Sequence, residues 1–200
     1  MARIIVCRHG NTFDKGDTVT RVGGRTDLPL STSGLAQAEA LGRHFAGTKF
    51  AAAYCSTLQR TRQTAEAILA TCEDAPPLRV LPFLTEVDYG PDENRPEEDV
   101  LARLGAEALA AWDQHAIVPD GWIVDTDTIR DGWRALIEDS SGPDTDETIL
   151  IVTSNGVARF LPGVVDLVPD GLDLKLKTGA WGEVETGALS RITDWNRRPG

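Results

Sequence analysis

The side chains best suited to chemistry stand directly after a short apolar run near the start of the sequence. Residues 3–7 (Arg-Ile-Ile-Val-Cys) are followed by Arg8, His9 and Gly10. An arginine fork fits phosphate or carboxylate, an imidazole acts as a nucleophile or as an acid or base near neutral pH, and a glycine lets the backbone approach a ligand. Taken alone, the segment predicts either an anion site or an ordinary turn with a solvated arginine and a hydrogen-bonded histidine.

The positions of these side chains depend on the strands that precede them. The apolar, β-branched residues 2–7 predict a buried strand. Two further runs of strand character end in polar residues in the same way: 50–55 before Ser56 and Arg60, and 148–153 before Ser154 and Asn155. Because ligands bind at the carboxyl ends of parallel strands, we expect Arg8, His9 and Arg60 to converge on one anion site. The amino end of the helix expected after residue 56 adds its dipole to that site.

Helices and further strands are expected around these runs. Helical spacing predicts helices after Ser33 and after residue 56 or 57, and residues 78–81 predict a strand at or near the sheet edge. Near the C-terminus, alternating apolar residues predict antiparallel strands or a hairpin over 172–176, 181–185 and 188–192.

The segment 85–145 differs in sequence pattern from the strand and helix runs around it. An acidic loop at 91–99 is followed by two stretches in which apolar residues recur at helical spacing. Their apolar stripes are Val100, Leu101, Leu104, Ala108 and Trp112 for the first, and Ile129, Trp133, Leu136 and Ile137 for the second. We interpret this segment as an insertion that covers one end of the main sheet.

Composition limits the classes of function and partner. The 200 residues carry a net charge of −11, which argues against nucleic acid binding, since that needs a basic face. No apolar stretch approaches the ~20 residues that span a bilayer, so no membrane partner is expected. The first strand begins without a signal-peptide core, which predicts a cytoplasmic protein. Three cysteines without a CxxC spacing indicate neither disulfides nor a zinc site, and no metal or other cofactor is expected.

Several ordered motifs resemble those of the histidine phosphatase superfamily, also called the phosphoglycerate mutase-like family. They are Arg8-His9-Gly10-Asn11-Thr12, residues 27–38 (Asp-Leu-Pro-Leu-Ser-Thr-Ser-Gly-Leu-Ala-Gln-Ala), residues 56–65 (Ser-Thr-Leu-Gln-Arg-Thr-Arg-Gln-Thr-Ala), Glu86 with Tyr89-Gly90, and residues 153–156 (Thr-Ser-Asn-Gly). The resemblance implies one domain over residues 1–200 with an α/β fold. That fold is a three-layer sandwich with a mixed, mostly parallel central sheet and helices on both faces, in which 85–145 covers the active-site end.

The resemblance also implies roles for individual residues. His9 would be the nucleophile that takes a phosphoryl group, with Arg8 and Arg60 holding the phosphoryl oxygens. Glu86 would be the general acid, although without the resemblance the sequence favours a solvated acid in an acidic loop. Asn11, Thr12 and Ser154 would help to bind the phosphate of a small phosphorylated molecule. No metal takes part in the implied reaction.

The sequence departs from the family pattern at Asn155, where the family normally has a second histidine. A protonated histidine donates a charge-assisted hydrogen bond, whereas asparagine donates a neutral one that is roughly half as strong. An asparagine that the family has a few positions after Arg-His-Gly is also missing. Arg21 and Arg25, in the irregular loop 14–32, are candidates for compensating cations, or else are ordinary solvated charges.

Several functions remain open at this point. The first is a phosphomonoesterase that works through a phosphohistidine on His9. The second is a catalytically weak or inactive protein of this fold that binds a phosphorylated or carboxylated ligand, with Asn155 as its support; repurposed chemistry on a non-phosphate substrate has the same support. The third is phosphotransfer of the mutase type. A hydrolase is favoured over a mutase because the Thr12-Phe13 context is phosphatase-like. The sequence predicts no particular oligomeric state.

Overall fold

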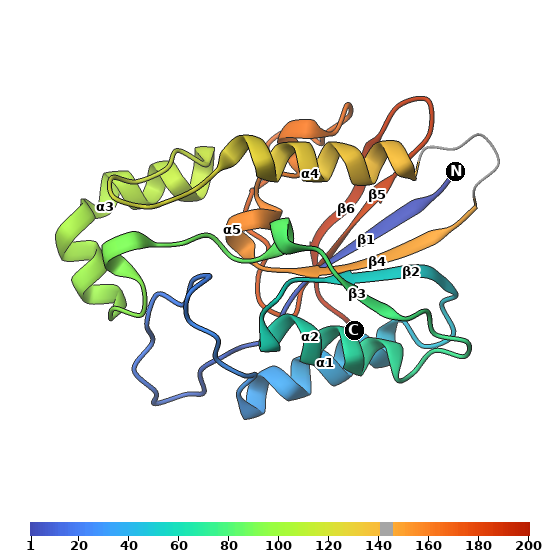
Figure 1. The fold of residues 1–200 in the computed structure, drawn as a ribbon, viewed down its shortest axis with the longest axis horizontal. Helices are drawn as coiled ribbons and strands as arrows, with labels where there is room; N and C mark the ends of the chain where they lie inside the picture. The colour runs from blue at the N-terminus through green and yellow to red at the C-terminus, as the bar shows by residue number, and fades with distance from the viewer. Residues whose placement is uncertain (141–145) are drawn as a thin grey trace.

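The computed structural model describes residues 1–140 and 146–200, and a mixed β-sheet lies at its centre (Figure 1). Across these residues the strand order is β3-β2-β4-β1-β5-β6. The strands are β1 (Arg3–Arg8), β2 (Phe50–Cys55), β3 (Leu78–Val80), β4 (Thr148–Thr153), β5 (Trp181–Glu185) and β6 (Arg191–Arg197). Strands β1 to β4 are parallel to one another, whereas β5 runs antiparallel to both of its neighbours.

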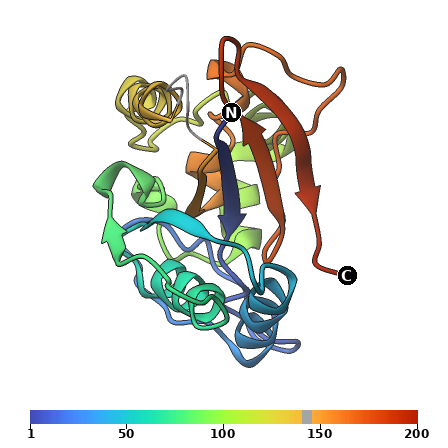
Figure 2. The same cartoon turned by 90° about the vertical axis from the view of Figure 1, so that its right-hand side faces the viewer.

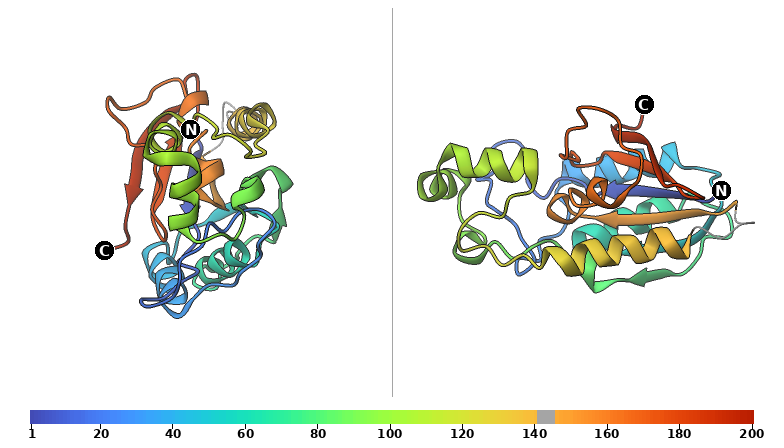
Figure 3. Two further views of the ribbon diagram at one scale, coloured as in Figure 1. Left: turned by 90° about the vertical axis from the view of Figure 1, so that its left-hand side faces the viewer. Right: turned by 90° about the horizontal axis from the view of Figure 1, so that it is seen from above.

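Helices cover both faces of this sheet (Figures 1 and 2). On one face lie α1 (Thr32–His44) and α2 (Gln59–Leu69), and on the other lie α4 (Thr126–Asp139) and the short α5 (Asn155–Ala158). Helix α3 (Glu97–His115) lies beyond the carboxyl ends of the parallel strands (Figure 3). Short 3-10 turns occupy Pro82–Leu84 (η1), Gly90–Asp92 (η2) and Pro162–Val164 (η3). None of the described helices is long and apolar enough to cross a membrane.

The alternation of side chains along the central strands explains the layers. Ile4 and Val6 of β1 belong to the apolar cluster that contains Trp133 of α4, whereas Ile5 belongs to the cluster that contains Leu41 of α1. Strand β4 divides its side chains in the same way. Because both faces are covered, the residues between the ends of these strands are apolar. The predicted α/β class, with its three layers and mostly parallel sheet, is confirmed.

The helices next to the strand ends begin close to the predicted positions. Ser31 caps α1, because its Oγ accepts a hydrogen bond from Gly34 N at 3.2 Å, so the predicted cap at Ser33 is wrong by two residues. Both serines are cap-type residues, and the local sequence does not distinguish them. Helix α2 begins at Gln59, whose N–H donates to Asp27 Oδ1 at 2.7 Å, so a carboxylate from the long loop takes the place of the predicted local cap.

The C-terminal segment differs from the prediction at 172–176, which does not form a strand. Lys175 N donates to the Asp173 carboxylate at 2.9 Å, and Leu176 N donates to Asn155 Oδ1 at 2.8 Å, so neither N–H pairs with a neighbouring strand. Strand β5 lies where it was predicted, and the strand expected at 188–192 begins later, as β6.

Both helices predicted within 85–145 are present, as α3 and α4, although residues 141–145 lie outside the described part of the chain. The apolar stripe predicted for α4 is buried. The stripe predicted for α3 is buried only at Val100 and Trp112, and Leu101 is exposed. Gly105 interrupts α3 with a φ of 79°, a conformation that favours glycine, so one helical period does not describe the buried side of this helix.

Trp133 links α4 to the strand end that carries Asn155, and its removal tests this packing. Its side chain is fully buried, and Nε1 donates to Val157 O of α5 at 3.1 Å. Trp133→Ala is expected to lower the free energy of unfolding by about 3–5 kcal/mol, because it leaves a cavity and removes the hydrogen bond that the indole donates to Val157 O. Urea unfolding followed by circular dichroism measures this loss. The exposed control Leu189→Ala should change it by less than ~0.5 kcal/mol, and an equally small loss for Trp133→Ala would contradict the packing described.

Candidate active site

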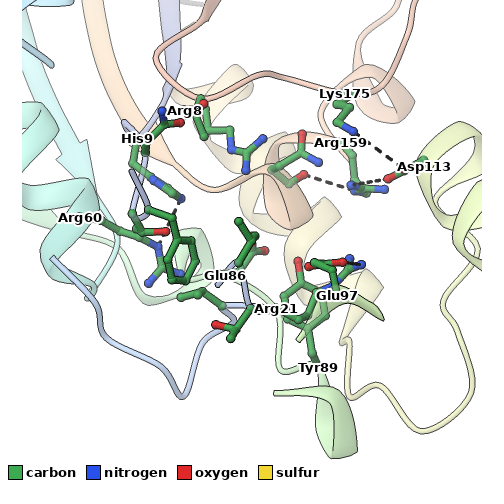
Figure 4. A pocket seen from close by; sticks show the side chains of 18 of the residues that line it. Arg8, His9, Arg21, Arg60, Glu86, Tyr89, Glu97, Asp113, Arg159 and Lys175 are labelled. Atoms are coloured by element: carbon green, nitrogen blue, oxygen red, sulfur yellow. Dashed lines mark hydrogen bonds and ion pairs between the residues drawn. The ribbon is translucent and has the colours of Figure 1, made fainter. Parts of the chain in front are cut away.

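A pocket of about 570 Å³ opens at the carboxyl ends of β1 and β4 and reaches to α3 (Figure 4). This volume is typical of sites for small molecules. Of the residues selected from the sequence, those that line the pocket are Arg8, His9, Asn11, Thr12, Arg21, Arg60, Glu86 and Asn155. Arg25 and Ser154 do not line it. The expected convergence of the strand ends therefore brings most of the candidate residues together.

His9 follows β1 and is held beside β4, since its backbone N–H donates to Thr153 O at 3.1 Å. Ring atom Nδ1 lies 2.7 Å from Gly10 O, and because a carbonyl only accepts, Nδ1 carries the proton. Nε2 then bears the lone pair and accepts a hydrogen bond from Arg60 Nε at 3.2 Å. Burial, followed by the charges of Arg60 and Arg8, lowers the pKa of His9 well below its ordinary value. The imidazole is therefore neutral near pH 7, as a nucleophile requires.

Arg60 stands in the first turn of α2 and is only 1% exposed. Besides the bond from Nε to His9, Nη1 donates to Thr26 O at 2.9 Å and Nη2 donates to Gly23 O at 3.2 Å. Burial lowers the pKa of Arg60, and the nearby charge of Glu86 opposes that shift. Each terminal nitrogen carries a second hydrogen, which is the donor that a phosphoryl oxygen in the pocket would meet.

One peptide segment orients both Arg8 and Asn155. Arg8 Nη1 donates to Leu176 O at 2.9 Å, and Leu176 N donates to Asn155 Oδ1 at 2.8 Å. The second bond fixes the orientation of the amide, so Nδ2 is the donor that Asn155 offers to a ligand. Arg8 Nε is buried without a hydrogen-bond acceptor among residues 1–140 and 146–200. The two side chains thus present unused donors on the same side of the pocket as His9.

Glu86 faces the same pocket and is 7% exposed (Figure 4). Its carboxylate accepts hydrogen bonds from Val87 N at 3.0 Å and from Gly156 N at 3.3 Å. A Cβ at position 156 would lie 2.0 Å from Glu86 Oε1, so the close approach requires glycine there. Burial lowers the pKa of both Arg8 and Arg60, and the charge of Glu86 opposes the two shifts, because the carboxylate is close to both cations. It is thus well placed to exchange a proton with a group bound between them.

Three other residues of the predicted phosphate loop and strand end have different surroundings. Asn11 and Thr12 line the pocket, and the Asn11 side chain is braced between Ser33 Oγ, to which Nδ2 donates at 3.2 Å, and Thr178 Oγ1, which donates to Oδ1 at 2.5 Å. Ser154 is fully buried, and within the described ranges its Oγ has no hydrogen-bond partner.

The two loop arginines proposed as compensating cations are both engaged by carboxylates. Arg21 lines the pocket, where Nη2 lies 2.5 Å from Glu97 Oε2 and the guanidinium packs 5.3 Å from the Tyr89 ring centroid. Arg25 points elsewhere, with Nε 2.9 Å from Asp88 Oδ2. The structure therefore brings Arg21 to the pocket as half of an ion pair and leaves Arg25 outside it.

The sequence interpretation missed a second polar group in the pocket, built around Arg159 (Figure 4). This side chain is 3% exposed, stacks 4.0 Å from the ring centroid of Trp112, and has Nη2 3.5 Å from Asp113 Oδ1. Lys175 Nζ lies 4.0 Å from the other oxygen of Asp113. The spacing of four residues between Asn155 and Arg159 places both on one side of a helical turn, and this was the available signal.

Comparison with known proteins identifies the family to which this arrangement belongs. The family model described as histidine phosphatase superfamily (branch 1) matches residues 4–192. The chain belongs to the histidine phosphatase superfamily. The matched range contains every motif on which the resemblance was based.

Curated relatives of this chain carry phosphatase and mutase names. An adenosylcobalamin/α-ribazole phosphatase of Escherichia coli is 32% identical over 122 residues, which is 60% of this chain and 58% of the relative. Fructose-2,6-bisphosphatase TIGAR B of Danio rerio is 37% identical over 55% of this chain and 43% of its own length. These alignments thus span about half of each relative. The Salmonella typhimurium adenosylcobalamin/α-ribazole phosphatase aligns over 92% of this chain and 90% of its own length at 27% identity.

Comparison with solved structures confirms the fold. Phosphoglycerate mutase from Bacillus anthracis superimposes with a TM-score of 0.81 at 19% identity, covering 98% of this chain and 92% of the mutase. The α-ribazole phosphatase from Shigella flexneri gives a TM-score of 0.74 at 22% identity over 99% of this chain and 98% of the phosphatase. At these identities the likeness shows the shared architecture alone.

The contact between Arg60 and His9 predicts a pH dependence. In the native protein the neutral imidazole should persist to pH values below about 6.5, the ordinary pKa of histidine. Arg60→Met removes a charge that lowers this pKa, so the pKa of His9 should rise and protonation should begin at a higher pH. Titration of the His9 ring nitrogens by ¹⁵N NMR measures the change, with His44 and His115 as internal references. An unchanged His9 titration in Arg60→Met would contradict the electrostatic coupling.

Proposed function

We propose that the chain is a phosphomonoesterase that forms a phosphohistidine on His9. The observation that carries the proposal is the buried, neutral imidazole of His9, with its Nε2 lone pair beside the guanidinium of Arg60. A nucleophile held next to a fixed cation suits an anionic electrophile, and a phosphate ester is the anion that the family acts upon. The phosphatase names of the relatives support the same reaction class.

In the first step, the phosphate of the substrate lies between Arg8 and Arg60. Nε2 of His9 attacks phosphorus in line with the leaving oxygen, so that a P–N bond forms as the P–O bond breaks. Arg60 Nε exchanges its hydrogen bond to Nε2 for one to a phosphoryl oxygen. Glu86, in its protonated form, donates its proton to the leaving alcohol. The two guanidinium groups stabilise the charge on the equatorial oxygens, which is the main requirement of phosphoryl transfer.

In the second step, water replaces the alcohol at phosphorus. The Glu86 carboxylate, now ionised, takes a proton from this water as its oxygen attacks. The P–N bond breaks, inorganic phosphate leaves, and His9 returns to the neutral form with its proton still on Nδ1. The bond from Nδ1 to Gly10 O holds the ring in one orientation through both steps.

Asn155 supplies a neutral donor where the family pattern has a histidine. Its amide is already oriented by Leu176 N, so no reorganisation is needed when a phosphoryl oxygen reaches Nδ2. This feature favours a working but weaker phosphatase. The second candidate, a protein that binds a phosphorylated ligand with little turnover, rests on the same residue, because a neutral donor retains binding while it stabilises less charge.

We extend the proposal to the setting of this activity. Residues 1–200 act as one domain in the cytoplasm on a small phosphorylated molecule, without nucleic acid or membrane partners. Of the segment predicted to cover the active-site end of the sheet, α3 lies there and discriminates between substrates, whereas α4 packs on a face of the sheet. No metal is required, because Arg8 and Arg60 supply the positive charge, so activity is expected to survive a chelator.

The nucleophile is tested with a generic aryl phosphate and the variant His9→Ala. Wild-type protein should release the phenol and should show a transient, acid-labile phosphoenzyme in rapid-quench experiments with ³²P-labelled substrate. His9→Ala should lose both, because it has no nitrogen to phosphorylate. His44→Ala, which removes a histidine that is absent from the pocket lining, is the matched control. Equal inactivity of wild type and His9→Ala across a panel of phosphate esters would refute the hydrolase, and phosphoryl transfer to an added alcohol in place of water would indicate a mutase.

Asn155→Asp tests the donor role of the amide without a change of shape. The carboxylate can still accept from Leu176 N, but an oxygen with negative charge replaces Nδ2. We expect kcat/KM to fall by ~10²–10³, the usual cost of one transition-state donor, while the stability changes little. Steady-state kinetics and thermal unfolding measure the two effects. Retention of more than a third of wild-type kcat/KM in Asn155→Asp would show that the amide donor is not used.

A further inference from the structure

Glu93 lies outside the pocket lining, yet it is the centre of a hydrogen-bond network that ends at the proposed nucleophile. Its Oε1 accepts from Gly23 N at 3.1 Å, from Arg25 N at 3.0 Å and from Thr26 Oγ1 at 2.8 Å. Its Oε2 accepts from Tyr89 N at 3.1 Å. One carboxylate therefore ties the loop 23–26 to the two residues that flank η2, Tyr89 and Glu93, and these segments are about 70 residues apart in the sequence.

The same loop holds the guanidinium of Arg60 with its carbonyl groups. Thr26 O accepts from Nη1 at 2.9 Å and Gly23 O accepts from Nη2 at 3.2 Å. These two bonds fix the plane of the guanidinium, and the remaining Nε–H then points at His9 Nε2, 3.2 Å away. Gly23 and Thr26 thus each bind both residues: they donate to Glu93 through an N–H or a hydroxyl group, and they accept from Arg60 through their carbonyls.

The loop has little freedom to move while Glu93 is in place. A Cβ on Gly23 would lie 2.1 Å from Glu93 Oε2 and 2.7 Å from Val87 O, so the backbone of the loop is pressed against both. Gly24 N also donates to Val87 O at 2.9 Å. Without the carboxylate, several donors of the loop lose their acceptor at once, and water can replace it only if the loop moves outward.

We infer that Glu93 is a positioning residue for the active site: it acts through the loop 23–26 to hold the Arg60 guanidinium against His9. The carboxylate touches neither the pocket nor the proposed reacting atoms. Its effect on turnover rests on the proposed function, whereas its effect on His9 does not. Besides burial, the charges that lower the pKa of His9 are those of Arg60 from α2 and the adjacent Arg8. Glu86 lines the same pocket (Figure 4).

The test uses Glu93→Ala and compares the titration of His9 with the kinetics. Release of the loop should let Arg60 move away and water enter, so the pKa of His9 should rise toward its ordinary value, by no more than it does in Arg60→Met. With an aryl phosphate, kcat/KM should fall tenfold or more, and kcat should carry part of the loss because Arg60 also meets the transferring phosphoryl group. If Glu93→Ala leaves both the His9 titration and kcat/KM as in the wild type, the inference is wrong.

Two milder variants keep the test decisive if Glu93→Ala does not fold. Glu93→Gln retains one oxygen that can accept from the loop, so kcat/KM should stay within about threefold of the wild type; a loss as large as that of Glu93→Ala would mean that charge, rather than anchoring, is what Glu93 supplies. Thr26→Val removes one anchoring bond and keeps the carbonyl that binds Arg60, so it should raise the pKa of His9 by a smaller amount. An unchanged His9 titration in Thr26→Val, with Glu93→Ala unfolded, would count against the inference.

Asp166→Ala is the matched control for a general loss of loop structure. Its carboxylate also holds a loop, accepting from Ser190 N and Oγ at 2.8 Å, but it is not part of the pocket lining. It should lower the thermal stability and leave the His9 titration unchanged; an equal His9 shift in this variant would overturn the assignment. If the wild type hydrolyses no phosphate ester, the proposed function fails, and the His9 titration alone then decides the role of Glu93.

Discussion

The structure depends most on keeping the guanidinium of Arg60 buried against the neutral ring of His9. A buried charge costs several kcal/mol unless polar groups replace its water. Here the carbonyls of Gly23 and Thr26 and the ring nitrogen of His9 do so, and the Glu86 carboxylate adds an opposite charge nearby. Segments far apart in the sequence must therefore meet around the Arg60 side chain. The contacts that stabilise the fold here are the same contacts that form the site.

The sequence predicts best those elements whose pattern is imposed by burial. The run 148–153 is buried throughout and apolar between its two threonines because both faces of β4 are covered, and the stripe of α4 repeats at helical spacing because one side meets the sheet. The prediction of the apolar stripe of α3 was only partly right, since Gly105 breaks the helix and α3 lies beyond the carboxyl ends of the parallel strands. The Leu174 region was wrong as a strand, because its backbone donors bind side chains instead of a neighbouring strand.

The same distinction applies to the candidate site. Arg8, His9, Arg60 and Asn155 could be selected from the sequence because each follows a recognisable strand, and strand ends of one sheet meet in space. The loop arginines could not be separated in this way. Arg21 and Arg25 have similar local surroundings in the sequence, yet one lines the pocket and the other pairs with Asp88 outside it. Their places are set by partners from the segment 88–97, which no local pattern specifies.

Arg8 and Asn155, two residues proposed to bind the phosphate, are oriented by backbone groups and not by another side chain. Leu176 contributes its N–H to Asn155 and its carbonyl to Arg8, and neither group changes when the side chain is replaced. The side chain at position 176 can therefore change without loss of either hydrogen bond, as long as the path of the chain is kept. Proline is the exception, because it has no N–H to donate. The backbone of an apolar residue, Leu176, thus orients two polar side chains, Arg8 and Asn155. A change in the path of the surrounding loop would therefore alter both of these side chains together.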